Sequence, residues 1–419
     1  MSKRTNRVHV AVGEKPQPVG EILFEADGRR QASVFRYAVD WLENPERFAI
    51  APSLPLGESP FYASASRANP RDALPGPVRD SSPDSWGRGL IRKNRSGELT
   101  ELDYLLAVDD RTRQGSLRYL DDEGMPLARS YPPIPRLSEL RELRSLARAA
   151  GSGREMTASE RDRLLGSAGS LGGARPKASV RDERGDLAIA KFTSDRDTVP
   201  IERAEVATLK LARAAGIDAA LARLELNDTD RPIALITRFD RMRTERISYL
   251  SAQSFVGAET ATGGFYTDIA DGLRAHASDP RRQMDELYRR ILFTILVSNT
   301  DDHLKNHGLL HVGGGRWMLA PAFDINPQPY RRRQLETGIS DLSGNVASIE
   351  AALEAGPFFG VARDSAAGAL SRIISTIDEE WRAHCLAAGM TVEEIKRYEP
   401  AFDHEESRVA RRVAARFHS

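Results

Sequence analysis

The sequence predicts an α+β protein in which a β-rich N-terminal subdomain precedes a larger body whose second half is mainly helical. Two observations predict this fold class. Short runs that alternate apolar and polar residues dominate the first 60 positions, as half-buried strands do. Beyond residue 240 the apolar residues recur mostly at helical spacing. The prolines of PPIP at 132–135 disfavour helix and place the first domain boundary near residue 136.

The N-terminal subdomain, residues 1–136, is expected to contain strands and short helices. RVHVAV, VGEILFEA and SVFRYAVDWL follow one another as strand-like runs, and the last of them turns helical toward its end. The proline-rich stretch PSLPLGESP at 52–60 predicts irregular chain. PDSWGRGLI at 83–91 predicts a turn that leads into a short helix.

The middle segment, residues 137–239, is expected to mix helices with strands. LSELRELRSLARAA (137–150) carries a leucine at every third position near its start, which predicts a helix with a narrow apolar stripe. SLGGARPKASV and DLAIAKF predict a glycine loop followed by a strand. ERAEVATLKLARAAGI predicts a helix capped by Gly216. RLELNDTDRPIALITRFDR predicts two strands around a turn at Asn227–Asp230.

The last segment, residues 240–419, is expected to be mostly helical. MDELYRRILFTILVSN (284–299) predicts a well-buried helix, because four of its residues fall on one face: Leu287, Ile291, Ile295 and Ser298. GLLHVGGGRWMLAPAFD interrupts the helices and predicts a hairpin that turns at Gly313–Gly315.

Composition excludes several classes of protein. The 419 residues carry 60 basic and 60 acidic side chains, so no global field attracts nucleic acid or membranes. The single cysteine, Cys385, rules out an internal disulfide framework and suits a reducing compartment. MSKRTNRVHV lacks the apolar core of a secretory signal, and no apolar run approaches the roughly 18–20 residues of a membrane span. We therefore expect a cytoplasmic protein with no membrane partner.

A dense polar cluster, SNTDDHLKNHGLL (298–310), directly follows the buried helix. Asp301 and Asn306 stand five positions apart in it, and Asp324 follows the hairpin in AFDIN. Helix, Asp-x4-Asn loop, hairpin and Asp form the large-lobe arrangement of protein kinases in this order. There the first Asp orients the attacking hydroxyl and accepts its proton, while the Asn and the later Asp hold magnesium on the nucleotide phosphates. The order predicts a two-lobed protein-kinase-like fold with its small lobe at 137–239 and its large lobe at 240–419.

The small lobe supplies the remaining parts of a nucleotide site. Gly172 and Gly173 let backbone N–H groups approach phosphate oxygens. The next strand ends in Lys191, where the lysine of a kinase pairs the α and β phosphates. A glutamate on the following helix commonly orients that lysine. Glu205 fits this role by its distance in sequence, and Glu202 is the alternative one turn back.

Each of these residues also has an ordinary structural explanation. Adjacent aspartates after a helix match turn chemistry, two glycines match a hairpin turn, and Lys191 matches a surface charge at a strand end. His303, His307 and His311 recur every four residues and suggest zinc, but Gly308 and the hairpin break the helix that would align them. Lys305 is either a solvated charge or a group that steadies the transferred phosphoryl group. The joint order of the parts favours a kinase-like phosphotransferase.

An ordered set of motifs extends over nearly the whole chain: VGEILF, PSLPL, PDSWGR, SLGGARPK, AIAKF, ITRFDR, NTDDHLKN and APAFDINP. This set resembles the HipA family of bacterial toxin serine/threonine kinases. The resemblance implies a β-rich N-terminal subdomain fused to a kinase-like fold, with ATP and Mg²⁺ as cofactors. It implies Asp301 as the catalytic base, Asn306 and Asp324 on the metal, and Lys191 on the phosphates.

The resemblance also assigns residues around the nucleotide. Contacts with it are expected from Gly172, Gly173, Ala174, Arg175, Pro176, Lys177, Thr237, Arg238, Phe239, His303, Lys305 and Asn306. Ser170, before the glycine loop, matches the serine that the family phosphorylates on itself. Thr237 departs from the family, because many members carry Glu there. If that acidic side chain contacts the nucleotide in the family, the change weakens ATP binding here, and no transfer residue is lost.

The function implied by the resemblance is that of a protein serine/threonine kinase acting as the toxin of a toxin–antitoxin pair. A small helix-turn-helix antitoxin is the expected partner, DNA is reached only through it, and aminoacyl-tRNA synthetases are the expected substrate class. Two alternatives stay open. Small-molecule kinases like the aminoglycoside phosphotransferases usually carry His two residues before the catalytic Asp, where this chain has Asn299. A non-catalytic corepressor or scaffold would keep the fold without turning over ATP.

Overall fold

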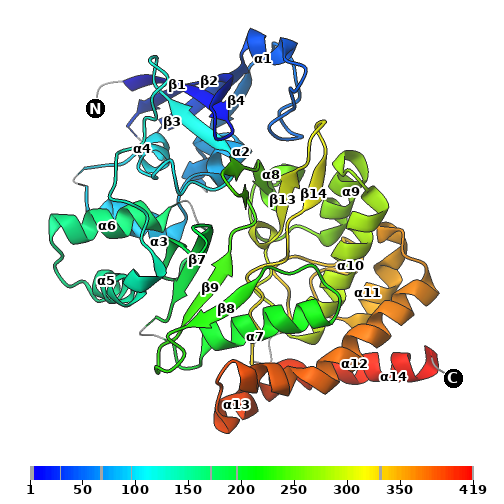
Figure 1. The fold of residues 1–419 in the computed structure, drawn as a ribbon. Helices are drawn as coiled ribbons and strands as arrows, with labels where there is room; N and C mark the ends of the chain where they lie inside the picture. Colours follow the sequence, from blue (N-terminus) through cyan, green and yellow to red (C-terminus); the bar gives the residue numbers. More distant parts are fainter. Residues whose placement is uncertain are drawn as a thin grey trace. The chain divides into compact units, whose positions relative to one another are not determined.

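The computed structural model describes residues 4–28, 30–66, 69–95, 97–169, 172–194, 197–329 and 333–417 (Figure 1). The chain divides into two compact units that are each assembled from separate segments. Unit 1 comprises Met1–Asp195, Arg238–Glu259 and Leu310–Gly315. Unit 2 comprises Arg196–Thr237, Thr260–Leu309 and Arg316–Ser419.

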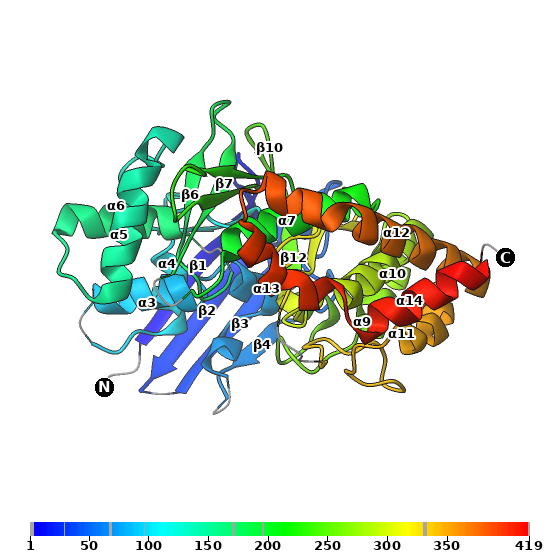
Figure 2. The ribbon, with the colours of Figure 1, turned by 90° about the horizontal axis from the view of Figure 1, so that it is seen from below.

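Unit 1 contains a five-stranded antiparallel sheet in the order β4-β3-β2-β1-β5, and β1 to β4 run side by side in Figure 2. The strands are β1 (Arg4–Val12), β2 (Gln17–Asp27), β3 (Arg30–Tyr37), β4 (Phe61–Ser64) and β5 (Leu117–Leu120). Val8, Ile22 and Phe35 lie opposite one another on three neighbouring strands and are buried. Because side chains alternate along a strand, this register places the apolar residues of each strand in one core.

The rest of unit 1 consists of short helices and short strands. The helices are α1 (Val39–Glu43), η1 (Pro70–Ala73), α2 (Gly76–Asp80), α3 (Ser85–Lys93), α4 (Glu101–Leu106), η2 (Leu137–Glu139), α5 (Leu140–Ser152), α6 (Ala158–Ala168) and α8 (Ala252–Val256). The strands are β6 (Lys177–Arg181), β7 (Leu187–Phe192), β10 (Arg241–Met242), β11 (Glu245–Arg246) and β12 (Tyr249–Ser251). Strands β6 and β7 form an antiparallel hairpin.

Unit 2 is mainly helical. Its helices are α7 (Ile201–Ala214), α9 (Tyr266–His276), α10 (Pro280–Leu296), η3 (Leu304–Asn306), α11 (Ile349–Ala355), η4 (Gly356–Phe359), α12 (Arg363–Ala387), α13 (Val392–Phe402) and α14 (Glu405–Phe417). Its strands are β8 (Ala222–Glu225), β9 (Ile233–Thr237) and β14 (Trp317–Leu319), while β13 (Gly308–His311) crosses the boundary between the units. The long helix α12 packs against α7, α10, α13 and α14. Trp381 of α12 stacks on Phe402 of α13 with ring centroids 4.5 Å apart.

Most elements follow the sequence prediction, and the predicted α+β class is confirmed. The three N-terminal strands, the helix at 201–214 with Gly216 in a left-handed conformation, and the hairpin that turns between β8 and β9 all form. The prediction for the buried helix was wrong at its ends, because α10 begins at Pro280 and stops at Leu296, so Ser298 lies beyond it. Residues 241–251, expected to be mostly helical, form the short strands β10 to β12 instead.

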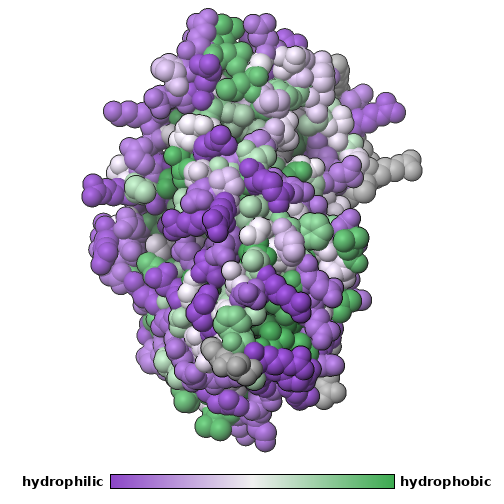
Figure 3. Space-filling view, turned by 90° about the vertical axis from the view of Figure 1, so that its right-hand side faces the viewer, coloured by the Kyte–Doolittle hydropathy of each residue, from purple (hydrophilic) through white to green (hydrophobic). Residues whose placement is uncertain are grey.

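In Figure 3, hydrophilic side chains cover most of the face shown, and hydrophobic ones lie between them in smaller groups. Among the described residues, no helix has both the length and the apolar character that crossing a bilayer requires.

Candidate active site

The C-terminal end of α10 leads directly into the loop that carries the candidate catalytic residues. The Asn299 N–H donates to the Thr294 carbonyl at 2.9 Å, which closes the last turn of the helix. Ser298 adopts a φ of 53°, in the left-handed region that side chains other than glycine rarely occupy. The chain therefore leaves the helix through a sharp turn that lies three residues before Asp301.

Asp301 and Asn306 are joined within this loop. The side chain of Asp301 is exposed, whereas Asn306 is buried. The Asn306 Nδ2 donates to the backbone carbonyl of Asp301 at 3.2 Å, and the His303 N–H donates to the same carbonyl at 3.1 Å. The five-residue spacing thus brings a base candidate and a metal-ligand candidate into direct contact.

Asp302, next to the exposed aspartate, is the buried anchor of the loop. It is 4% exposed, and its Oδ2 accepts from the Tyr266 hydroxyl at 2.5 Å, the His307 Nε2 at 3.1 Å and the Thr294 hydroxyl at 3.4 Å. Burial alone raises the pKa of this carboxyl, but the His307 charge and the hydrogen bonds from His307 and Tyr266 outweigh it and hold the pKa below its usual range. Asp302 is therefore a carboxylate that fixes the loop from inside.

Asp324 is held in an uncommon backbone conformation and is linked to the same loop. Its φ is 57°, so it lies in the left-handed region like Ser298. The Asn326 Nδ2 donates to Asp324 Oδ1 at 3.0 Å. The Asn326 N–H donates to the side-chain Oδ1 of Asn299 at 3.1 Å, and Asn299 is only 1% exposed. Asn326 thus connects the Asp324 carboxylate with the chain two residues before Asp301.

Downstream of Asp324 the chain makes further contacts with the loop. Residues 333–347 fold back on themselves, and the Glu336 N–H donates to the Thr300 carbonyl at 3.2 Å. The Tyr266 N–H donates to the Gly338 carbonyl at 2.8 Å, so this segment is also fixed to the start of α9. A cavity of about 20 Å³, room for one water molecule, lies behind the loop. Its lining includes Thr294, Asn299, Asp302, Asn306 and His307.

In unit 1 the loop that contains Gly172 and Gly173 is held by the motif PDSWGR (83–88). Asp84 accepts from the Gly173 N–H at 3.0 Å, and the Trp86 N–H donates to the Gly173 carbonyl at 3.3 Å. Gly173 has a φ of 97°, which a residue with a side chain adopts only with strain. The Lys177 ammonium donates to the Gly172 carbonyl within the loop. A role for PDSWGR in shaping this loop was not part of the sequence prediction.

The loop leads into the hairpin that carries the candidate lysine. Gly172 and Ala174 are exposed, while Arg175 and Pro176 are partly buried. Lys191, also partly buried, lies opposite Lys177 in the register of β6 and β7. Ser170 lies outside the residues that the structure describes.

Arg238 has a structural task in unit 1. Its side chain is buried, its guanidinium makes two hydrogen bonds to Asp240 at 2.8 and 2.5 Å, and it donates to the carbonyls of Thr112 at 2.7 Å and Arg113 at 3.1 Å. Burial raises the pKa of Asp240, but Arg238 and Arg241 lower it more strongly and keep the carboxyl ionised. A nucleotide contact from this residue would therefore come from its backbone. Phe239 lies 6.3 Å from the Tyr249 ring, centroid to centroid.

The remaining nucleotide candidates lie in both units. Thr237 is exposed at the end of β9 in unit 2, where its N–H donates to the Leu221 carbonyl at 2.9 Å. Glu202 and Glu205 are both buried on α7, also in unit 2. Buried carboxylates are rare unless they are paired, so both positions fit a role in orienting a cation. Lys191 belongs to unit 1, and its pairing with Glu205 stays a prediction.

The histidines of the loop have separate environments. His307 hydrogen-bonds to Asp302, and His311 stacks on Phe48 with ring centroids 3.8 Å apart. His303 is partly buried and its Nδ1 has no hydrogen-bond partner among the described residues, while Lys305 is partly exposed. Within the described ranges no three His, Cys, Asp or Glu side chains converge on a metal position. An amide and a carboxylate, as in Asn306 and Asp324, offer the oxygen ligands that suit Mg²⁺.

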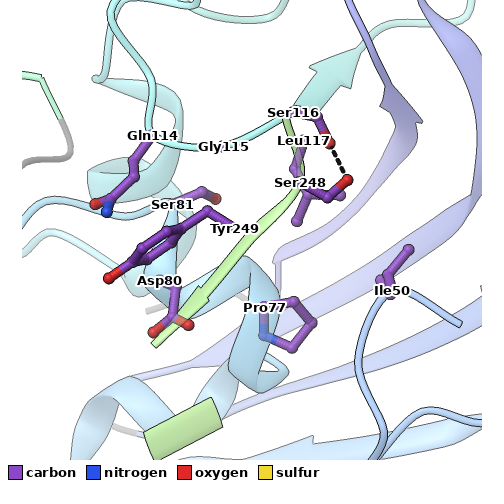
Figure 4. Close-up of a pocket in the computed structure, with 10 residues that line it drawn as sticks. All are labelled: Ile50, Pro77, Asp80, Ser81, Gln114, Gly115, Ser116, Leu117, Ser248 and Tyr249. Atoms are coloured by element: carbon purple, nitrogen blue, oxygen red, sulfur yellow. Dashed lines mark hydrogen bonds between the residues drawn. The ribbon is translucent and has the colours of Figure 1, made fainter. Parts of the chain in front are cut away.

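A second cavity lies in unit 1 and is shown in Figure 4. Its volume is about 10 Å³, so it is too small for a nucleotide. Ser116 and Ser248 hydrogen-bond to each other at 2.5 Å along its lining. Asp80 accepts from the Ser251 N–H at 2.7 Å and from the Ser251 hydroxyl at 2.8 Å. These contacts fix β12 to α2 and give the cavity a structural explanation.

Family models match the chain in two places. The model of the HipA N-terminal domain matches residues 10–120, and the model of the HipA-like C-terminal domain matches residues 169–381. Among solved structures, HipA of Shewanella oneidensis MR-1, in a complex with HipB and its operator DNA, has a TM-score of 0.69 at 14% identity. That match covers 98% of this chain and 96% of the Shewanella chain, and at this identity it shows a shared fold.

Two sequence relatives also match. "Putative kinase Y4mE" of Sinorhizobium fredii is 26% identical over 318 residues, which are 70% of this chain and 71% of that protein. A "Putative kinase" of Haemophilus influenzae is 27% identical over 107 residues. The latter match covers 23% of this chain and only 31% of the length of that relative. The C-terminal family model alone matches about half of the residues of this chain, and the N-terminal model matches as well. The chain therefore belongs to the HipA family.

Proposed function

We propose that this chain is an ATP-dependent protein serine/threonine kinase that acts as the toxin of a toxin–antitoxin system. One observation in unit 2 carries the proposal. Asn306 hydrogen-bonds to the backbone of Asp301, and Asn326 connects Asp324 with Asn299 just before that same aspartate. A base candidate and two candidate oxygen ligands for a metal are thereby linked by hydrogen bonds and by the short stretch of chain 299–301.

In the proposed reaction, the hydroxyl oxygen of a substrate serine or threonine forms a bond to the γ-phosphorus of ATP. The bond from this phosphorus to the oxygen that bridges to the β-phosphate breaks, and ADP leaves with the negative charge. The hydroxyl proton passes to the carboxylate of Asp301. Asp301 suits this role because its side chain is exposed, whereas that of its neighbour Asp302 is buried and engaged by three donors.

Asn306 and Asp324 are proposed to hold Mg²⁺. The fit rests on the hard oxygen atoms of both side chains and on the buried Oδ1 of Asn326 beside Asp324, which has no hydrogen-bond donor among the described residues. When bound, the ion neutralises charge on the β and γ phosphates. Lys191 is proposed to pair the α and β phosphates, with Glu205, or Glu202 one turn back, orienting it.

The residues from Gly172 to Lys177 are proposed to cover the phosphates. Asp84 fixes the course of this loop by accepting from the Gly173 N–H, so that donor is engaged in this conformation. Thr237, Arg238 and Phe239 are proposed to contact the nucleotide, Arg238 through its backbone. His303 and Lys305 are proposed to contact it from the catalytic loop.

The proposed partners follow from family membership. The Shewanella HipA that shares this fold is in a complex with HipB and operator DNA. This supports an antitoxin of the helix-turn-helix kind as the partner of this chain, with DNA reached through that antitoxin. An aminoacyl-tRNA synthetase is the proposed substrate class, and the cytoplasm is the proposed compartment.

Ser170 is proposed to be phosphorylated by the kinase itself and to switch it off. A phosphoryl group adds about −1.5 to −2 charge at neutral pH. Directly before the glycine loop, this charge would repel the nucleotide phosphates or draw the loop away from them. Mass spectrometry after incubation with ATP and Mg²⁺ should find phosphate on Ser170 in the parent and none in a variant that lacks the base.

Phosphoryl transfer from radiolabelled ATP tests the function. The variant Asp301→Asn should lose about 10²-fold or more of the transfer rate while still binding nucleotide, because it loses only the base. The matched control is Asp364→Asn, which removes an exposed carboxylate at the start of α12 and should transfer at the parental rate. Near-parental transfer by Asp301→Asn would contradict the assignment. Labelling of an aminoglycoside but of no protein would favour a small-molecule kinase, and no ATP turnover would favour a scaffold.

A further inference from the structure

Asn326 is a side chain beside the proposed metal site to which the sequence assigned no role. Its Nδ2 donates to Asp324 Oδ1 at 3.0 Å. A carboxylate only accepts hydrogen bonds, so the amide must turn its nitrogen toward Asp324. This fixes the orientation of the side chain and directs its carbonyl oxygen, Oδ1, away from that contact.

The Oδ1 of Asn326 is buried and has no hydrogen-bond donor among the described residues. Buried side-chain oxygens in folded proteins nearly always have a partner, and an exception is explained by strain, by a catalytic role, or by a bound water or ion. Through its Nδ2, the same side chain already contacts Asp324, a proposed magnesium ligand. A partner of this oxygen would therefore be bound by the same side chain that contacts the Asp324 carboxylate.

The backbone of Asn326 fixes this oxygen relative to the catalytic loop. The Asn326 N–H donates to the Oδ1 of the buried Asn299 at 3.1 Å, two residues before Asp301. The Gln328 N–H donates to the Ser298 carbonyl at 3.1 Å and holds the same segment at a second point. The left-handed conformation of Asp324, with φ of 57°, turns the chain between these contacts.

We propose that Asn326 is a member of the magnesium site, an assignment that rests on the proposed kinase function. Its Nδ2 orients the Asp324 carboxylate, and its Oδ1 supplies an oxygen to the ion, either directly or through a water of the ion's own shell. Mg²⁺ usually takes only one or two carboxylates from a protein and keeps several waters, so a neutral amide oxygen beside them fits its preferences. The Asp-x-Asn sequence of AFDINP is the local signal for this pair.

A magnesium titration of nucleotide binding by the full-length protein tests the inference. The probe is a fluorescent, non-hydrolysable ATP analogue, and the readout is the Mg²⁺ concentration at half-maximal binding. Asn326→Ala should raise this concentration by about 10- to 100-fold, the usual effect of losing a residue that orients a metal ligand. Asn326→Asp keeps an oxygen for the ion but cannot donate to Asp324, and its midpoint should fall between those of the parent and Asn326→Ala.

The matched control is Asn345→Ala, the same substitution at an exposed asparagine of unit 2, which should keep the parental midpoint. A parental midpoint in Asn326→Ala, with a raised one in Asp324→Asn, overturns the inference and leaves the proposed function standing. A parent that binds nucleotide without any response to Mg²⁺ overturns both. If thermal melting shows that Asn326→Ala does not fold, Asn326→Ser takes its place, and a parental midpoint in that variant overturns the inference in the same way.

Discussion

Replacement of Asp302 should cost stability, because three donors converge on one buried carboxylate oxygen. In Asp302→Ala, the Tyr266 hydroxyl and the His307 Nε2 lose their acceptor in positions where both residues are buried. Each buried donor left without a partner costs about 1–3 kcal/mol, which gives about 4 kcal/mol for the two. The Thr294 contact, at 3.4 Å, is long and adds little. The estimate is a large part of the 5–15 kcal/mol that stabilises an ordinary domain.

The variant Asp302→Asn tests the negative charge of this side chain separately from its shape. The amide keeps an acceptor oxygen of the same size but loses the negative charge, and hydrogen bonds to a charged acceptor are about twice as strong as neutral ones. We therefore expect a loss of about 1–2 kcal/mol in the free energy of unfolding. Combining Asp302→Asn with Tyr266→Phe should cost less than the sum of the two changes, because both remove the same contact.

Urea unfolding at pH 7 measures the free energy of unfolding of both variants. The control is Asp364→Ala, the same change at an exposed aspartate. The ionised form of Asp302 is favoured by folding, since its pKa lies below the usual range. Its contribution to stability is therefore present above the unfolded pKa of about 3.9 and is lost as the pH falls through the lower folded value. The difference between the parent and Asp302→Asn should accordingly shrink below about pH 4. If Asp302→Ala had its unfolding midpoint at the same urea concentration as the parent, the reasoning would be refuted.

Three further outcomes are expected. Lys191→Ala should lose phosphoryl transfer but change the free energy of unfolding by less than ~0.5 kcal/mol, as measured by thermal melting without nucleotide. Gly338→Ala should destabilise by about 1–3 kcal/mol, because its Cβ would lie 2.6 Å from an aromatic ring, whereas Gly151→Ala meets nothing within 4 Å and should be neutral or stabilising. Burial lowers the pKa of His311 from 6.5 to about 4, so the fold should lose stability as the pH falls between these values, and His311→Phe should flatten that part of a stability–pH curve.

Strong local patterns made much of the fold predictable. The alternating residues of β2 and β3 and the apolar face of α10 specify their elements without help from distant contacts. Helix α6 was missed although its start carries a sequence signal, the capping box between Thr157 and Glu160. Strand β5 was missed because LRYL is four residues long and lies among charges, so only its pairing with β1 identifies it.

The division of the chain into units was harder to predict from the sequence. A sequence can be cut only into continuous segments, such as 1–136, 137–239 and 240–419, and these boundaries stay predictions. Arg238–Glu259 belongs to unit 1 although it follows a strand of unit 2. The physical reason lies in the buried ion pairs between Asp240 and its flanking arginines, which also hydrogen-bond to the carbonyls of Thr112 and Arg113. No local pattern in RFDR shows that its partners lie more than a hundred residues earlier.

The two adjacent aspartates show why the site itself was only partly predictable. Their spacing from Asn306 and Asp324 marks the loop, but sequence alone does not show which aspartate is buried. Tyr266 decides it, because its hydroxyl lies 2.5 Å from Asp302 although it stands 36 residues earlier. His307, one of the three histidines that suggested zinc, is a second donor to the same oxygen.

Much of the loop that carries Asp301 lies outside helices and strands, so contacts other than their regular backbone hydrogen bonds must hold its geometry. Hydrogen bonds to two buried polar side chains, Asp302 and Asn299, hold this loop. Asp302 holds the loop from below, and the Asn299–Asn326 contact joins it to the turn that carries Asp324. Asp302 directly follows the exposed Asp301, and Asn326 lies two residues after the partly exposed Asp324. A buried neighbour can hold an accessible group in place, which is why we expect changes at Asp302 and Asn326 to alter function without replacing Asp301, the proposed base.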